Sequence, residues 1–196
     1  MGTRGLLVVK NKKGEIKLAE YIGHDSYPSY AGYKIVEFCN NKDNLEKLQK
    51  YLENNVKLVE DLYKTSEENI KFCEKHEGVD MLDAIINNFE NNKTKLDLIC
   101  NDLSTKLDVI YAEDHMSFGQ DSLFCEWVYM IDFKLNRLTV FKGFNKLPFN
   151  QAEEFKTDKP RSGYWGVEEL LLFNLDDLPK SKSEFVAPFQ KMDLYV

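Results

Sequence analysis

Two stretches of this chain decide its fold: residues 4–10, Arg-Gly-Leu-Leu-Val-Val-Lys, and residues 125–132, Cys-Glu-Trp-Val-Tyr-Met-Ile-Asp. The first stretch is apolar on both faces, which is typical of a strand in the centre of a sheet. In the second stretch the side chains alternate, which predicts a strand with two different faces. One face would carry Cys125, Trp127, Tyr129, Ile131 and Phe133, and the other Glu126, Val128, Met130 and Asp132.

Each stretch is followed by turn residues and a second run of strand-forming residues. After residues 4–10 come the turn Asn-Lys-Lys-Gly and a strand over 15–22, in which Ile16, Leu18 and Glu20 share one row. After residues 125–132 the chain turns at 134–137 and returns over 138–141. The sequence therefore predicts two hairpins, and an apolar run over 167–175 predicts a fifth strand.

Between the two hairpins the apolar period changes to that of a helix. Asp43 and Glu46 have the spacing of a capping box, and the leucines behind them predict a helix of about 20 residues over 43–63. Further helices are predicted near 66–77, 79–89, 96–103 and 181–190. We therefore expect a single α+β domain over 1–196, with a mainly antiparallel sheet of about five strands and a helical insertion over about 31–110.

The composition excludes several classes of protein. The chain has 196 residues, 26 basic and 33 acidic, and a net charge of −7, which argues against a nucleic-acid partner. No apolar run approaches the roughly 18 residues that a membrane span needs, so we expect no membrane contact and a cytoplasmic location. Four cysteines without metal-ligand spacing predict reduced core thiols, no metal site and no cofactor.

A candidate site follows from the geometry of the first hairpin. Strand 4–10 begins where strand 15–22 ends, so Thr3 and Arg4 should lie close to the loop His24-Asp25-Ser26-Tyr27-Pro28. Arginine is rare here, at positions 4, 137 and 161 only, and a planar guanidinium would pair with the carboxylate of Asp25. We expect a ligand-binding site formed by Arg4, Asp25, Tyr27, Glu126 and Trp127.

The same loop permits a catalytic interpretation. Thr3 or Ser26 would supply a nucleophilic hydroxyl, His24 or a freed α-amine the base, and Asp25 the orienting group. The alternative is a hydrogen-bonded loop without chemistry, because Asp and Ser in loops usually bond to local backbone.

These motifs resemble a family found in bacteria, phages and fungi. Its members begin with Met-Gly-Thr-Arg-Gly and a hairpin, continue with an Asp-Ser-Tyr-Pro-like loop, and later carry a Cys-Glu-Trp-x-Tyr-x-Ile-Asp strand. The resemblance covers roughly residues 1–40 and 120–145 of this chain. It implies a shared fold and a shared site at Arg4, Asp25, Tyr27 and Trp127, and it implies no activity.

A more distant similarity connects Gly2-Thr3 with the processing junction of the N-terminal-nucleophile hydrolases. We therefore expect a non-catalytic binding protein for a small ligand or a partner protein, with a phage or mobile-element accessory or counter-defence role. The alternative is an amidohydrolase that uses Thr3 or Ser26 with His24 and Asp25. A homodimer through the predicted helix 43–63 is a further expectation.

Overall fold

The computed structural model describes residues 2–90, 107–192 and 194. Its main sheet has the strand order β2-β1-β5-β6-β7, and every neighbouring pair is antiparallel except β1 with β5. The expected α+β fold with a mainly antiparallel sheet is confirmed. The strands are β1 (Gly5–Lys10), β2 (Ile16–Ile22), β5 (Trp127–Asp132), β6 (Arg137–Lys142) and β7 (Glu168–Asn174).

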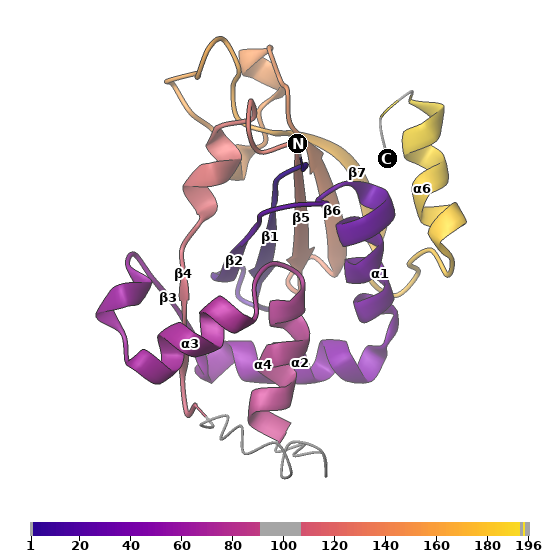
Figure 1. Cartoon of the computed structure of the whole chain (residues 1–196). Helices are drawn as coiled ribbons and strands as arrows, with labels where there is room; N and C mark the ends of the chain where they lie inside the picture. The colour runs from indigo at the N-terminus through magenta and orange to yellow at the C-terminus, as the bar shows by residue number, and fades with distance from the viewer. Residues whose placement is uncertain (1, 91–106, 193, 195–196) are drawn as a thin grey trace.

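The parallel pair in the centre determines where the connecting loops meet. Gly5 is the register partner of both Ile22 and Trp127, and Trp127 is also the partner of Lys142. The starts of β1 and β5 and the ends of β2 and β6 therefore lie at one end of the sheet. We call this the loop end; it comprises residues 2–5, 23–27, 121–126, 142–149 and 161–165. Figure 1 shows the N-terminus and the orange loops between β6 and β7 at this end.

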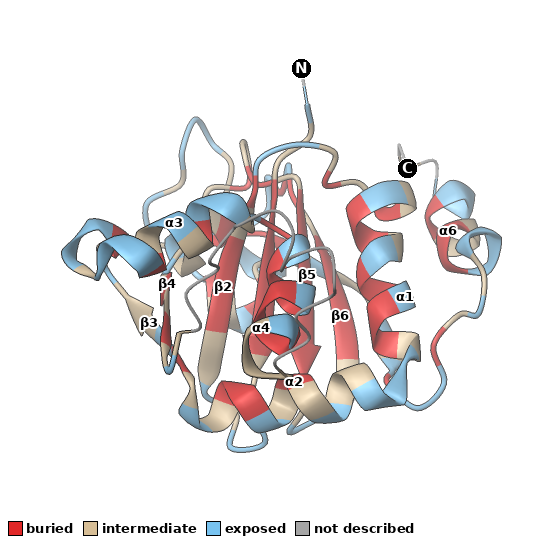
Figure 2. Ribbon diagram, turned by 60° about the horizontal axis from the view of Figure 1, so that its bottom comes forward, coloured by how far each residue is buried: buried red, intermediate tan, exposed pale blue. Residues whose placement is uncertain are grey.

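Helices cover one face of the sheet (Figure 2), and short turns pack against the other. On the helical face, Leu7, Trp127 and Tyr129 belong to the same buried cluster as Ile35 and Phe185. On the opposite face, Leu6, Val8 and Met130 pack with Phe155 from a 3₁₀ turn, Glu153–Phe155. The helices are α1 (Tyr33–Asn40), α2 (Lys42–Asn54), α3 (Glu67–Lys75), α4 (Asp80–Glu90) and α6 (Lys182–Lys191).

The predicted helix over 43–63 is wrong in its length and in its cap. Helix α2 ends at Asn54, and the chain continues as strand β3 (Val56–Val59), which pairs in parallel with β4 (Ile110–Glu113). The Asn41 side chain, rather than a capping box, accepts from the first-turn backbone N–H groups. The block between the hairpins is thus not purely helical, because β-branched residues after Asn55 favour a strand.

The buried face of α2 packs within its own chain. Leu48 and Leu52, two of the leucines that predicted a dimer seam, are 0% exposed in the main core. The helix predicted near 96–103 lies outside the described residues. Among the residues that are described, no helix is long and apolar enough to cross a membrane.

The predicted alternation along β5 is correct, with one exception. Trp127, Tyr129 and Ile131 face the helices, and Val128 and Met130 face the other way. Cys125 packs with Val128 and Met130 instead of with Trp127, because it lies in the turn before β5 and not in the strand.

Candidate functional site

The structure places the two segments of the predicted site side by side at the loop end. The Ser26 backbone N–H donates to the carbonyl oxygen of Thr3 over 3.3 Å, and the Glu126 N–H donates to the carbonyl oxygen of Arg4 over 2.9 Å. The expected proximity of the N-terminal segment to the 24–27 loop is therefore confirmed. Glu126 joins them from the start of β5.

The side chains of the 24–27 loop are not arranged for nucleophilic catalysis. Ser26 is 0% exposed, its Oγ has no hydrogen-bond partner, and the Tyr129 hydroxyl donates to its carbonyl oxygen over 2.7 Å. Asp25, at a φ of +51°, accepts a hydrogen bond from the Tyr27 hydroxyl, while His24 is exposed. The Ser26 hydroxyl, a candidate nucleophile from the sequence, is thus buried in this structure.

The sequence led us to expect an ion pair between Arg4 and Asp25, but the structure does not form it. Its guanidinium carbon lies 4.7 Å from the centre of the Phe124 ring, and that of Arg161 lies 4.5 Å from the centre of the same ring. The two guanidinium groups therefore share one aromatic ring. Arg161 is also held by Asp121, with 2.8 Å between Nη1 and Oδ2.

A two-residue turn brings Arg161 to this ring. Arg161 and Tyr164 exchange two backbone hydrogen bonds, and the residues between them, Ser162 and Gly163, have φ values of +52° and +81°. Positive φ at both central positions is the type I′ geometry, which glycine adopts without strain. The Tyr164 ring packs edge-on against Phe144, so this small hairpin contacts Phe124 on one side and Phe144 on the other.

A second cation lies among aromatic rings beside this hairpin. The Lys142 ammonium is 4.2 Å from the centre of the Trp127 ring and 5.0 Å from that of Phe144. Burial lowers the pKa of Lys142, while the carboxylate of Glu126 raises it. Trp127 itself is 1% exposed and packs edge-on against Phe189 in the core. Trp127 therefore lies in the core and supports Lys142, and its role as a ligand contact stays a prediction.

Two buried polar residues fix the loops that carry these groups. Asn145, 3% exposed, receives a hydrogen bond from the Leu147 N–H and donates to the Gly166 carbonyl, and its own N–H donates to Ser122 Oγ. The carbonyl of Ser122 accepts from the Phe144 N–H over 2.7 Å. Hydrogen bonds within the chain thus hold the three loops together, and such preorganisation lowers the cost of binding wherever it occurs.

The loop end carries more cations than carboxylates. Its cations are Arg4, Lys142, Lys146 and Arg161, and its carboxylates are Asp25, Asp121 and Glu126. Of these cations only Arg161 forms an ion pair with a described residue. In a chain of net charge −7, the loop end therefore has a small local excess of positive charge.

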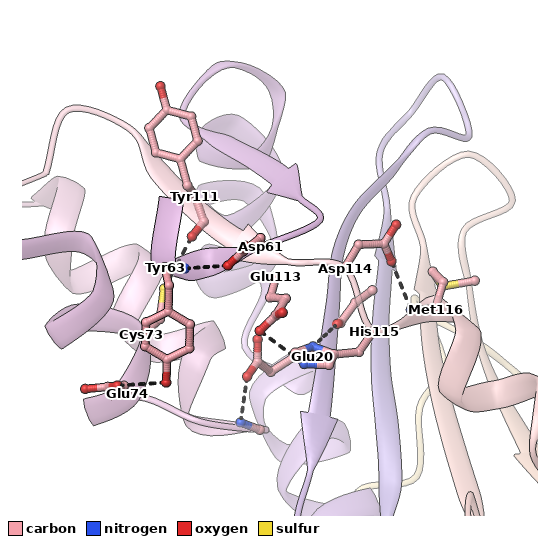
Figure 3. A network of polar contacts seen from close by, with 12 residues as sticks. Glu20, Asp61, Tyr63, Cys73, Glu74, Tyr111, Glu113, Asp114, His115 and Met116 are labelled. Atoms are coloured by element: carbon pink, nitrogen blue, oxygen red, sulfur yellow. Dashed lines mark hydrogen bonds and ion pairs between the residues drawn. The ribbon is translucent and has the colours of Figure 1, made fainter. Parts of the chain in front are cut away.

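A second polar cluster, which the sequence did not identify as a site, lies where β2 meets β4 (Figure 3). Glu20 is 8% exposed and accepts a hydrogen bond from the Gly78 N–H over 3.4 Å. Burial is the main cause that raises the pKa of Glu20 to about 8; the carboxylates of Glu77 and Glu113 act in the same direction, and the hydrogen bond from Gly78 acts against them. The signal was present in the sequence, since Glu20 shares the apolar row of Ile16 and Leu18.

Glu20 lies where the end of β4 and the residues after it pack against β2. His115 donates its backbone N–H to the Ala19 carbonyl, and its Nε2 lies 3.7 Å from Glu113. Within residues 2–90, 107–192 and 194, no group of three His, Cys, Asp or Glu side chains is arranged to hold a metal ion.

A hollow of about 610 Å³ lies on the far side of β4, between Asp61, Ser66 and Tyr111. Its one buried amide, Asn69, already exchanges hydrogen bonds with the backbone of Tyr111 and donates to Thr65 Oγ1. The Asn69 amide therefore has no free hydrogen-bonding group to offer a ligand. We take the loop end as the better candidate site. Comparisons with family models, curated proteins and solved structures found no match.

Proposed function

We propose that this protein is a non-catalytic binding protein that recognises an anionic ligand through its loop end. The observation that carries the proposal is the pair of guanidinium groups on Phe124, at 4.7 and 4.5 Å from the ring centre. The ring holds both groups in place, so their outward N–H donors lose little side-chain entropy when a carboxylate or phosphate binds.

Backbone strain at this end of the sheet supports the same proposal. Four non-glycine residues of the described chain have positive φ, and three of them, Asp25, Phe144 and Ser162, lie at the loop end. Such conformations each cost roughly 1 kcal/mol or more and concentrate at binding sites. Asn136, the fourth, lies in the turn between β5 and β6 at the opposite end.

The test is binding of an oligoaspartate peptide at low ionic strength, measured by calorimetry. We expect the double variant Arg4→Gln/Arg161→Gln to bind at least about tenfold more weakly than the unchanged protein. Arg137→Gln, at the opposite end of β6, is the matched control and should bind normally. Equal affinity in the double variant and the control, or no binding to any of the three proteins, would refute the proposal.

The hydrolase alternative has its own test. The purified protein is assayed with amide and ester substrates, together with Thr3→Ala and Ser26→Ala. Turnover that disappears in either variant, with folding unchanged by circular dichroism, would replace the binding proposal with a catalytic one.

A further inference from the structure

The loop end also carries an exposed apolar segment beside its cations. Phe144 is 44% exposed, Leu147 45% and Phe149 79%. Of the eight large hydrophobic residues that are exposed in the described chain, these three fall within six consecutive positions, and Lys146 lies among them. Isolated exposed apolar residues are ordinary, whereas a group of them is typical of an interaction surface.

This segment is held in a fixed conformation. Phe144 has a φ of +59°, and the next residue, Asn145, bonds through both its backbone and its side chain to Ser122, Leu147 and Gly166. The hydrogen bonds of the buried Asn145 therefore fix the backbone of this segment in the conformation that leaves its apolar side chains exposed. Rigid aromatic side chains on a fixed loop are typical of the residues that dominate the free energy of binding at protein interfaces.

Resting on the function proposed above, we propose that the anion is an acidic peptide segment of a partner protein. Its carboxylates would pair with Arg4, Arg161 and Lys146. Its apolar side chains would cover Leu147 and Phe149. The surface thus combines charge complementarity with an apolar anchor, as protein interfaces do.

Two observations favour a peptide over a nucleic acid or a small anion. The guanidinium groups of Arg4 and Arg161 lie 4.7 and 4.5 Å from the centre of the Phe124 ring, so they compete with a nucleobase for stacking on it. A small anion would leave Leu147 and Phe149 uncovered. An acidic peptide with aliphatic or aromatic residues satisfies both parts of the surface.

The experiment is selection of random peptides, displayed on phage, against the immobilised full chain. We expect the enriched peptides to combine Asp or Glu with Leu, Phe or Trp. Synthetic copies should bind Leu147→Ser/Phe149→Ser about tenfold more weakly or worse, and should bind Leu172→Ser, which alters a residue 50% exposed on strand β7, normally.

The outcomes separate this inference from the function on which it rests. If the selected peptides are acidic without apolar residues and bind Leu147→Ser/Phe149→Ser normally, the peptide inference is overturned while anion binding stands. If they are neutral or basic, or if nothing is enriched over the Leu147→Ser/Phe149→Ser protein, the inference is also overturned. Loss of oligoaspartate binding in Arg4→Gln/Arg161→Gln tests the parent proposal independently.

Discussion

Replacing Glu20 by glutamine should stabilise the protein at alkaline pH and leave it nearly unchanged at acidic pH. Glu20 is 8% exposed, and its folded-state pKa is about 8 against 4.5 for an ordinary glutamate. The cause is burial beside Glu77 and Glu113, with one hydrogen bond from the Gly78 N–H as partial compensation. The group is therefore protonated in the folded chain at neutral pH and ionised in the unfolded chain.

The sign follows from the protons bound in each state. Below pH 4.5 both states are protonated, and Glu20 has no effect on the pH dependence. Between pH 4.5 and about 8 the folded state binds more protons than the unfolded state, so the free energy of unfolding falls by up to about 1.4 kcal/mol per pH unit. Above pH 8 both states are ionised, and the full cost of about 3 to 5 kcal/mol is reached.

Glutamine keeps the side-chain carbonyl that accepts from Gly78 and never ionises. The neutral amide also avoids the repulsion that an ionised Glu20 would have with Glu77 and Glu113. The stability of Glu20→Gln relative to the unchanged protein should therefore rise from near zero at pH 5 to about 3 kcal/mol or more at pH 9.

The assay is urea unfolding followed by the fluorescence of the two tryptophans, Trp127 and Trp165, at unit pH steps from 5 to 9. Glu169→Gln, an exposed glutamate on strand β7, is the matched control and should show no such trend. A difference between Glu20→Gln and the unchanged protein that does not vary with pH would refute the reasoning.

Three further predictions test packing, backbone geometry and thiol burial. Phe189→Ala should lower the free energy of unfolding by about 3 to 5 kcal/mol, because Phe189 is 0% exposed against Trp127, whereas Phe149→Ala should change it by less than about 0.5 kcal/mol in the same urea assay. Gly143→Ala should lower the melting temperature far more than Gly163→Ala. An added Cβ at position 143 would lie 2.1 Å from the Cys125 carbonyl oxygen, whereas at position 163, where φ is +81°, it would lie in open space. Equal shifts in the two variants would contradict this reasoning. In a Cys100→Ser background, the thiols of Cys39, Cys73 and Cys125 should react with a disulfide reagent at pH 8 only after urea is added. The reason is that all three are buried and that burial raises the pKa of each thiol, that of Cys73 to about 12. Rapid reaction of the folded chain would contradict their burial.

The candidate site was predictable in its location more than in its chemistry. Hairpin geometry alone brings residues 2–5 to the 24–27 loop, and the scarcity of arginine drew attention to Arg4 and Arg161. The partner of these arginines was not predictable, because Phe124 lies 120 positions from Arg4 along the chain. The burial of Ser26 and Trp127 depends on Tyr129 and Phe189, which are also remote from them in sequence.

By itself, the sequence determined the local structure: strands from two-residue alternation, hairpins from their turn residues, and an α+β fold from the order of the segments. Those signals act between near neighbours and need no knowledge of the remaining chain. Only the tertiary structure decided the parallel pairing of β1 with β5, which brings the segments that precede these two strands to the same end of the sheet. It also decided that α2 ends at Asn54 and that Glu20 is buried, because packing between distant segments outweighs the weak local preference of any one of them.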